Sequence, residues 1–454
     1  MKIAHVGQPW DRMLPSQGNI TTSIAVIIVN SAKELQARGH EVLIYCPGER
    51  YSLRKQVEHA DGITYRAMGM VRLENRANRV LNRFWPVTDP ARPYYTSKLA
   101  HRLYAEQVAR DLKTQNVDIV HLHNMFQFAS PIRAANPNVK IVLHMHCEWL
   151  SQLDRDIIMD RIKGVDLVLG VSGHITGRIL ERLPYLGDRC RTVYEGASLA
   201  QFSANGHIAA SDPSNQQIMF LGRVSPEKGV HVLIDAFPKI AAACPQARLD
   251  IVGPLGAAPL DFLVGLSKDP LVQDLTRFYD PVHMGHPTYE AYLMARIPEE
   301  LKDRVTFTGP VPNHQVSEHY RRAALLASPS LSDAMPLPPL EAMVDGKPVV
   351  AAATGGLKEI VAHDETGFLV EPANADELAD AIIRLLQDPE LRFRMGQAAR
   401  ERVRRLFSWQ SVVDKAEALY HELLSGKLAP ATAPATGTPT GTSLGTQPLP
   451  VDEN

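Results

Sequence analysis

Cysteine is scarce in this sequence, and no apolar run is long. The four cysteines, Cys46, Cys147, Cys190 and Cys244, lie far apart and form no CxxC pair. This spacing argues against a disulfide framework or a zinc site and favours free thiols in a reducing compartment. The longest apolar candidate, residues 20–35, is interrupted by Thr, Ser, Asn and Lys, so no segment has the ~20 apolar residues of a transmembrane helix. The first residues also lack the pattern of a secretory signal, and we expect a cytoplasmic protein.

A strong net charge is missing as well. The chain has 48 basic and 50 acidic side chains in 454 residues, which argues against a general nucleic-acid binder. With 45% hydrophobic residues it can build substantial cores. Its length exceeds the ~100–200 residues of one ordinary domain, so we expect two or three globular domains.

Short apolar strands alternate with amphipathic helices in two successive series. The first series includes KIAHV, EVLIY, DIVHL and KIVLHM, and the second includes IMFLGR, RLDIVG and KPVVAAAT. This alternation predicts an α/β protein with parallel sheets, which bind ligands beyond the carboxyl ends of their strands. We expect two tandem Rossmann-like, doubly wound domains, residues 1–205 and 206–406, with the polar residues 202–217 as the linker.

The other segments are interpreted from length and composition. Residues 257–300 are longer than a plain connection and are expected to be helical decoration of the second domain. Residues 407–425 are expected to form a last helix. Residues 426–454 are rich in Pro, Thr, Gly and Ala, which predicts a disordered tail.

Two acids stand eight positions apart in the segment SDAMPLPPLEAMVDGKPVV. Pro338 and Pro339 suit the first turn of a helix. Asp333 then lies in the loop before that helix, and Glu341 lies in its first turn. Taken alone, these acids allow a plain interpretation, in which Glu341 complements the helix dipole and Asp333 is a solvated loop acid.

Cations and glycines stand at two predicted strand-to-helix turns. In FLGRVSPEKGVHVLIDAF, Arg223 follows a strand, and Lys228 and Gly229 precede a helix. Helix N-termini favour anions, and an arginine with a lysine beside them suits a diphosphate, although ordinary loop charges are the alternative. No GxxxxGK[ST] loop occurs, which disfavours ATP hydrolysis of the Walker type. Gly18, in the turn after the first strand, gives only a weak signal of a phosphate or sugar site.

Four histidines stand at the ends of buried strands. HLHN contains His121 and His123, and LHMHCEW contains His144 and His146. A histidine cluster raises the question of a metal site. Acidic or thiolate partners at matching positions are not evident, so core or substrate-contacting histidines are the favoured interpretation.

Together these segments resemble the retaining glycosyltransferases of family 4, which have the two-domain GT-B fold. FLGRVSPEKGVHVLIDAF is similar to the family's GR…KG segment. SDAMPLPPLEAMVDGKPVVAAATGGLKEIV is similar to its EGFGLPxLEAMAxGxPVVAxxxGGxxEIV motif, and RLFSWQSVVDKAEALYHEL to its closing FSW helix. The resemblance covers roughly residues 1–425. It implies a central cleft between an acceptor-binding and a donor-binding domain, and a helix at 407–425 that crosses back onto the first domain.

The resemblance also implies roles for the matched residues. Arg223 and Lys228 match cations that hold the donor diphosphate. Asp333 matches an acid that meets the donor sugar, and Glu341 matches an acid that hydrogen-bonds the ribose. His146 matches a histidine that contacts the sugar from the opposite domain.

Four more residues are expected to bind the donor. Gly18 lies in the loop over the phosphates, Val311 lies where main chain binds the base, and Met335 and Leu337 belong to the motif of Asp333. The implied reaction is a metal-independent, retaining transfer of a sugar, of the hexosyltransferase type, from a nucleotide diphosphate sugar. No cofactor is required if the two cations and helix amides hold the diphosphate charge. The acceptor, a saccharide, a lipid-linked precursor or a small molecule, is left open.

The sequence departs from the family pattern at several positions. Asp333 replaces a glutamate, and Met335-Pro336 replaces the FG pair, where proline lacks an N–H. Glu195 stands where the family's NG turn usually has Asn. These departures keep an alternative open, in which a GT-B protein binds nucleotide or carbohydrate without transfer, as the partner of an active enzyme. A phosphorylase is less favoured, because no lysine site for pyridoxal phosphate is evident.

Residues 66–102 contain an excess of basic over acidic side chains, interleaved with aromatic residues. The cations are Arg66, Arg72, Arg76, Arg79, Arg83, Arg92, Lys98 and Arg102, and the aromatic residues are Phe84, Trp85, Tyr94 and Tyr95. This pattern favours peripheral contact with the inner membrane face or with an anionic lipid-linked acceptor. The alternative is a solvated face whose arginines pair with acids elsewhere.

Overall fold

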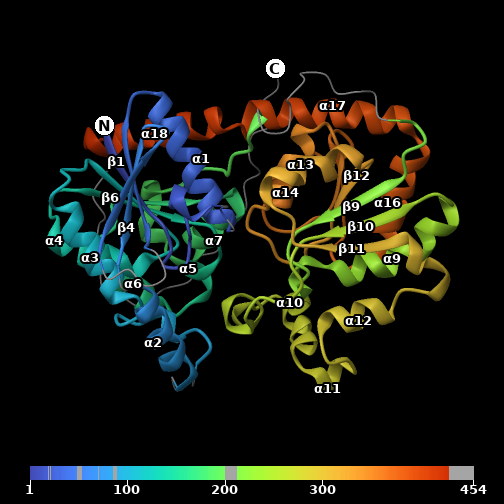
Figure 1. Ribbon diagram of the computed structural model, residues 1–454, viewed down its shortest axis with the longest axis horizontal. Coiled ribbons are helices and arrows are strands. Elements are labelled where there is room, and N and C mark those ends of the chain that lie inside the picture. The colour runs from blue at the N-terminus through green and yellow to red at the C-terminus, as the bar shows by residue number, and fades with distance from the viewer. Residues whose placement is uncertain are drawn as a thin grey trace.

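Two largely parallel β-sheets organise the chain, one in each half of the sequence (Figure 1). The structure, a computed structural model, describes residues 1–18, 20, 22–48, 54–69, 71–84, 89–199 and 212–428. The predicted tail after residue 428 and residues 202–211 of the predicted linker lie outside the described residues. The domain boundaries given above therefore stay predictions.

The first sheet has eight strands in the order β3-β4-β2-β1-β5-β6-β7-β8. The β3–β4 pair is antiparallel, and the other neighbours are parallel. The strands are β1 (Lys2–Val6), β2 (Glu41–Pro47), β3 (Gln56–Ala60), β4 (Ile63–Met68), β5 (Ile119–His123), β6 (Lys140–Met145), β7 (Leu167–Gly170) and β8 (Cys190–Thr192). The helices of this half are α1 (Ser23–Ala37), α2 (Val71–Phe84), α3 (Arg102–Leu112), α4 (Ala129–Ala135), α5 (Trp149–Gln152), α6 (Arg155–Arg161) and α7 (Gly173–Arg182).

Helices cover both faces of this sheet. Successive residues of a strand point to opposite faces, so neighbouring residues pack against different helices. Ile3 and Ile119 belong to the apolar cluster that includes α1 and the C-terminal helix α18 (Trp409–Leu424). Ala4 and Val120 belong to the cluster that includes α3 and α4. The first half is therefore a doubly wound α/β domain, as the strand pattern predicts.

The second sheet has six parallel strands in the order β11-β10-β9-β12-β13-β14. The strands are β9 (Gln217–Leu221), β10 (Arg248–Val252), β11 (Val305–Gly309), β12 (Leu325–Ser328), β13 (Val349–Ala352) and β14 (Gly367–Val370). The flanking helices are α9 (Val230–Ala243), α13 (Asn313–Arg322), α14 (Leu337–Val344), α15 (Leu357–Ile360), α16 (Ala375–Gln387) and α17 (Pro389–Leu406). Ile218 packs with α9 and α16, and Met219 lies in the cluster with α14 and α17.

The segment expected to be decoration is helical. It contains α10 (Pro270–Asp274), α11 (Pro281–Met284) and α12 (Tyr289–Ala295). Short 3-10 helices lie before, among and after them, at Leu260–Phe262, Val264–Leu266, Leu275–Tyr279 and Glu299–Arg304.

The end of the described chain returns to the first domain, as expected. Figure 1 shows α17 over the second sheet and α18 over the first. Trp409 and Tyr420 of α18 are buried in the cluster of α1. Arg38, just after α1, pairs with Asp414 at 2.5 Å and Glu417 at 3.0 Å. The chain thus has the predicted pair of Rossmann-like domains with a crossing helix.

Two further contacts join the domains. The carboxylate of Glu359 on α15 accepts hydrogen bonds from the backbone N–H groups of Gly173 (2.7 Å) and His174 (2.8 Å), at the start of α7. The indole N–H of Trp149 donates to the carbonyl of Phe262 at 3.0 Å. These contacts link residues of the first half of the chain to residues of the second.

The strand orders locate the cleft expected between the domains. From β1 the first sheet continues to β2 on one side and to β5 on the other, and from β9 the second sheet continues to β10 and to β12. Such reversals leave a crevice at the carboxyl ends of the central strands, where open α/β sheets bind ligands.

Candidate active site

A cavity of about 620 Å³ lies between the two domains. Its walls are loops that follow the strands. Gln8, Asn124 and His146 follow β1, β5 and β6, and Arg223 and Ser330 follow β9 and β12. The cavity therefore occupies the crevice that the strand orders predict.

The predicted diphosphate residues meet at the second domain's wall. Lys228 Nζ lies 2.6 Å from Asp333 Oδ2. Burial alone would lower the pKa of Lys228, but the negative charges of Asp333 and Glu227 raise it, so the lysine is charged. Arg223 lines the same cavity, is exposed, and has no ion-pair partner among the described residues. Two positive charges thus face the cleft beside the start of α9.

Glycines permit the close packing of this wall. Gly229 has a φ of 68°, and a side chain there would collide with the carbonyl of Pro329. Gly355 has a φ of 47°, and a side chain there would collide with the carbonyl of Asp333, whose oxygen accepts a hydrogen bond from Gly356 N–H at 3.2 Å. The KG and GG pairs therefore fix the loops that present Lys228 and Asp333.

Glu341 lies one turn deeper in its helix than predicted and does not itself line the cavity, so its donor-binding role remains a prediction. Because α14 begins at Leu337, Glu341 is its fifth residue and is in the second turn. Its Oε2 accepts a hydrogen bond from the Tyr320 hydroxyl at 2.9 Å. Burial raises its pKa to about 7, and the Tyr320 hydrogen bond opposes that rise. The carboxyl is thus held by a tyrosine rather than by the helix N-terminus.

The other predicted donor-binding residues divide into two groups. Met335 and Leu337 line the cavity. Gly18 and Val311 do not line it. Gly18 has a φ of 80° in the loop between β1 and α1, and Val311 lies between β11 and α13, packed against the apolar cluster of α14. Their donor-binding roles remain predictions.

The loop between β1 and α1 has a buried acid at its centre. The fully buried Asp11 accepts hydrogen bonds from Gln8 N–H and from the Gln8 amide, both at 3.1 Å, and from the Thr22 hydroxyl at 2.8 Å. Burial raises the pKa of Asp11, and these hydrogen bonds oppose the rise. This network holds Gln8 and Thr22 at the cavity wall.

His146 lines the cavity, but both of its ring nitrogens are already engaged. Nε2 lies 2.9 Å from His123 Nδ1, and Nδ1 lies 3.0 Å from Glu195 Oε1. Burial lowers the pKa of His146 to about 3, so its ring is neutral. A direct contact between its nitrogens and a sugar remains a prediction, and Glu195 is the adjacent polar group on the same wall.

Glu195, Asp11 and Tyr320 were not predicted as site residues. Glu195 was noticed only as a departure from a family motif. Asp11 could have been noticed in the sequence, because it is an acid between the first strand and the threonine that precedes the first helix. Tyr320 gave no signal, because its hydroxyl meets Glu341 only through the packing of α13 on α14.

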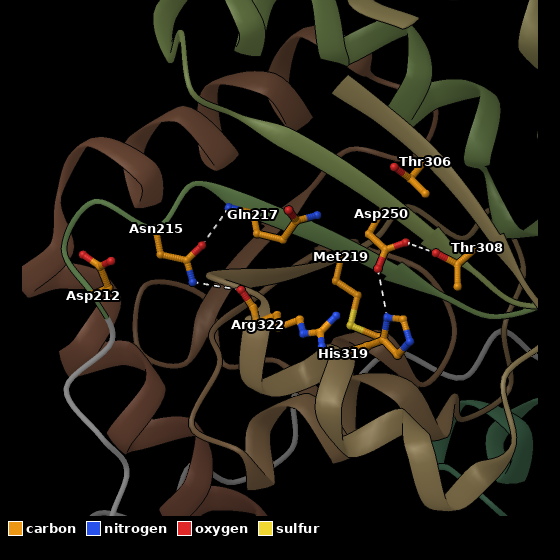
Figure 2. A pocket seen from close by; sticks show the side chains of 9 residues that line it. All are labelled: Asp212, Asn215, Gln217, Met219, Asp250, Thr306, Thr308, His319 and Arg322. Carbon is orange, nitrogen blue, oxygen red and sulfur yellow. Dashed lines mark hydrogen bonds and ion pairs between the residues drawn. The ribbon is translucent and has the colours of Figure 1, made fainter. Parts of the chain in front are cut away.

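A second cavity, of about 500 Å³, is lined by residues of β9, β10, β11 and α13 and of the segment before β9 (Figure 2). Its polar groups mostly bind one another. Asp250 accepts from Thr308 at 2.5 Å and contacts His319 at 3.0 Å, and Asn215 donates to the carbonyl of Arg322 at 2.9 Å. The predicted site residues do not line this cavity, and we assign no function to it.

Two doubly wound domains, a cleft between their strand ends, and a last helix that returns to the first domain define the GT-B class of proteins. The sequence matches the family "Glycosyltransferase Family 4" over residues 24–201 and the family "Glycosyl transferases group 1" over residues 207–402. Together the two matches cover most of the chain, which therefore belongs to the glycosyltransferases of family 4.

Curated relatives support the same family. The putative glycosyltransferase YtcC of Bacillus subtilis is 26% identical over 363 residues, which cover 75% of this chain and 83% of that protein. The D-inositol 3-phosphate glycosyltransferase of Corynebacterium efficiens is 31% identical over 247 residues. That alignment covers 52% of this chain and 51% of that enzyme, about half of each.

Solved structures share the fold. Sucrose-phosphate synthase from Thermosynechococcus elongatus superposes with a TM-score of 0.65 at 21% identity, covering 94% of this chain and 99% of that chain. HepE from Anabaena, solved in complex with UDP-glucose, has a TM-score of 0.58 at 19% identity, covering 93% of this chain and 100% of that chain.

Within the described residues, the helices are too short or too polar to span a bilayer.

Proposed function

We propose that this glycosyltransferase moves a sugar from a nucleotide diphosphate sugar to an acceptor, with retention at the anomeric carbon and without a metal ion. The observation that supports this most is the meeting of Arg223, Lys228 and Asp333 at one cavity wall, at the ends of β9 and β12. HepE, which shares the fold, was solved with UDP and with UDP-glucose. Uridine donors are therefore the first to test.

The chemistry needs charge stabilisation more than a strong nucleophile. When the bond between the anomeric carbon and the phosphate oxygen breaks, negative charge develops on the leaving diphosphate. Arg223 and Lys228 lie where they can stabilise that charge, together with the first N–H groups of α9. Asp333 would then meet the sugar, and Glu341 the ribose hydroxyls. A metal is not needed for charge balance in this arrangement.

Helix α2 is the basis of our proposal for how the acceptor is reached. Its side chains Glu74 and Asn78 are turned toward the rest of the first domain. Glu74 accepts hydrogen bonds from the N–H groups of Leu103 (2.6 Å) and Tyr104 (2.9 Å). Asn78 accepts from the Tyr94 hydroxyl at 2.7 Å. Because α2 contacts the domain through these polar side chains, its apolar side chains are left uncovered.

That apolar face is exposed to solvent. Leu73, Val80, Leu81 and Phe84 expose 54%, 57%, 47% and 76% of their surface, and they follow one another at helical spacing. Figure 1 shows α2 at the lower edge of the first domain. An exposed apolar stripe of this kind marks a contact surface.

The basic patch predicted at 66–102 is narrower in the structure. Arg66, Arg92, Lys98 and Arg102 pair with Asp111, Asp154, Asp160 and Glu106. Tyr94 is buried, and Tyr95 packs on Trp149 and Phe262. Trp85 lies outside the described residues. The alternative of paired arginines is therefore correct for half of the patch.

Arg76 and Arg79 remain beside the apolar stripe of α2, exposed and without an ion-pair partner among the described residues. A helix with an exposed apolar face flanked by arginines suits the surface of an anionic membrane. We therefore propose a cytoplasmic protein that contacts the inner membrane face through α2 and receives a lipid-linked acceptor there.

A second candidate is a GT-B protein that binds donor without transfer. Pro336 lines the cavity without an N–H to offer the donor, and this observation favours the candidate. The two candidates predict different results with the same ligands.

The experiment is a panel of nucleoside diphosphates and their sugars, scored by thermal shift and by slow donor hydrolysis. The transferase predicts a shift with one base and hydrolysis of its sugar conjugate. A shift without hydrolysis or transfer would support the non-catalytic candidate. The absence of any shift with the whole panel would contradict both.

A further inference from the structure

Histidines of three neighbouring strands gather on one side of the first sheet. His5 of β1, His121 and His123 of β5, and His144 of β6 are buried on the side covered by α1 and α18. The strand register places His5 beside His121, and His123 beside His144. His146 follows β6, stacks on His123 and packs at a tilt against His144. The group reaches from the domain core to the cavity.

Hydrogen bonds join three of these histidines to Glu195 in one line. Glu195 Oε1 lies 3.0 Å from His146 Nδ1, and His146 Nε2 lies 2.9 Å from His123 Nδ1. His123 Nε2 lies 3.1 Å from His5 Nδ1. His5 Nε2, at the far end, is buried without a hydrogen-bond partner among the described residues.

The direction of these bonds follows from simple chemistry. A neutral imidazole has one N–H and one lone pair. Burial lowers the pKa of His5 to about 3, and that of His123 well below its ordinary value, so these rings are neutral like that of His146. If Glu195 accepts from His146 Nδ1–H, then His123 Nδ1–H donates to His146, and His5 Nδ1–H donates to His123.

The reverse direction is disfavoured. It would place the N–H of His5 on the buried Nε2, where no described group accepts it. A buried donor without a partner is rarer and costlier than a buried lone pair. The line of histidines therefore holds His146 with its proton on Nδ1, directed at Glu195 Oε1.

Glu195 itself lies at a point where substrate can reach it. It lines the cavity between the domains. Oε1 is taken by His146, and Oε2 has no hydrogen-bond partner among the described residues. Asp333 and Lys228 lie close enough to affect its ionisation: burial and Asp333 raise its pKa well above the ordinary value, and Lys228 lowers it. Glu195 thus shares the cavity with the two residues proposed to contact the sugar and the diphosphate.

We propose that Glu195 binds a hydroxyl of the transferred sugar through Oε2, and that His146, His123 and His5 position it. This inference rests on the proposed function for the presence of a sugar in the cleft. The hydrogen bond from His146 Nδ1 keeps Oε1 as an acceptor, so a proton taken up by Glu195 resides on Oε2. The carboxyl can then accept from a sugar hydroxyl when ionised, or donate to one when neutral.

His121 provides a matched control within the same stack. His121 and His123 lie two residues apart on β5, both are buried, and their rings stack at 4.5 Å. His121 Nδ1 instead bonds to the Tyr420 hydroxyl, 2.6 Å away, and takes no part in the line to Glu195. His123→Phe breaks that line, whereas His121→Phe removes a comparable buried ring without breaking it.

The first readout does not depend on activity. Nitrogen-15 NMR of histidine-labelled protein reports which ring nitrogen holds each proton. We expect an Nδ1–H signal for His146 in the unmodified protein, and its loss or shift in Glu195→Ala and His123→Phe but not in His121→Phe. An Nε2–H signal for His146 in the unmodified protein would overturn the proposal. So would a stoichiometric zinc ion, found by elemental analysis, that His123→Phe abolishes.

The second readout is kinetic, with the donor found by the nucleotide panel. Glu195→Ala should lower kcat/KM for the donor by more than about tenfold, while the Kd of the free nucleoside diphosphate changes less than about twofold. Glu195→Gln should restore most of the activity and flatten the pH profile. Equal losses of donor and nucleoside diphosphate binding would overturn the contact with the sugar. If no donor is used at all, the proposed function fails, and the NMR result alone decides the role of the histidines.

Discussion

Lys228 Nζ and Asp333 Oδ2 lie 2.6 Å apart, although 105 positions separate the two residues in the sequence. Lys228 follows β9 and Asp333 follows β12, and these strands are neighbours in the second sheet. In the free protein the lysine proposed to hold the diphosphate is therefore bound by the acid proposed to meet the sugar. A donor must compete with Asp333 for Lys228.

This pairing predicts that Asp333→Ala separates nucleotide binding from transfer. Without Asp333, Lys228 has no competing carboxylate at its Nζ, so the free nucleoside diphosphate should bind as tightly as before or more tightly. Transfer should fall, because the contact with the sugar is lost. Calorimetry with nucleoside diphosphate and with intact donor measures the difference. Equal losses for both ligands would show that Asp333 has another role.

Arg223→Ala and Lys228→Ala should each lower turnover more than about tenfold, because each removes a charge-assisted contact worth roughly 1.5–3 kcal/mol. Steady-state kinetics with the identified donor provide the measurement. Lys239→Ala is the control, because Lys239 lies on α9, the helix that follows Lys228, and pairs with Asp380 outside the cavity. Wild-type turnover in both cleft variants would mean that the diphosphate binds elsewhere.

Glu341 predicts a pH dependence of nucleotide binding. Its pKa is raised to about 7 by burial, and only the carboxylate form can accept hydrogen bonds through both oxygens. Nucleotide affinity should therefore fall as the pH is lowered through about 7. Glu341→Gln should bind more weakly than the unmodified protein at pH 8 and show little change down to pH 6. Calorimetry from pH 6 to pH 8 measures the nucleotide affinity of both proteins. The same pH profile of affinity in both would contradict a role for Glu341 ionisation.

The same raised pKa has a consequence for stability. In the unfolded chain the carboxyl has its ordinary value of 4.5. The folded protein therefore binds a proton that the unfolded chain releases between 4.5 and about 7, and stability falls as the pH rises through this window. Thermal unfolding of both proteins gives the Tm of Glu341→Gln minus the Tm of the unmodified protein. This difference should be more positive at pH 8 than at pH 4.5.

Helix α2 predicts binding to anionic vesicles. The double change Leu81→Ser and Phe84→Ser removes two of its exposed apolar side chains, and should abolish sedimentation with vesicles that contain anionic lipid. High salt should weaken binding of the unmodified protein, because arginine attraction to anionic lipid is screened. Val282→Ser, at another exposed apolar residue, on α11, is the control. Equal sedimentation of the double variant and the unmodified protein would assign the contact to another surface.

Much of the fold follows from the sequence, because strand and helix periodicities recur along the whole chain. The alternating series predict two doubly wound domains, and parallel strands place the loops after β9 and β12 at one edge. Arg223, Lys228 and Asp333 therefore meet as the family resemblance implies. Their roles toward a donor stay predictions.

Other features depend on packing that periodicity does not specify. The pairing of Glu341 with Tyr320 requires α13 to lie on α14, and Glu341 lies in the second turn because α14 begins before the two prolines rather than at them. The link from His5 to His123 requires β1 and β5 to be neighbours in a particular register. An HxH pattern predicts that both rings share a face, but not which hydrogen bonds they form.

The stereochemistry of the first sugar product distinguishes a retaining transferase from an inverting or inactive protein. An α-linked nucleoside diphosphate hexose, of the base selected by thermal shift, is incubated with the protein, and proton NMR follows the first sugar product formed by hydrolysis or transfer. We predict that the α anomer appears first and that Lys228→Ala suppresses it. A β anomer as the first product, or no consumption of a donor that binds, would contradict a retaining nucleotide-sugar transferase.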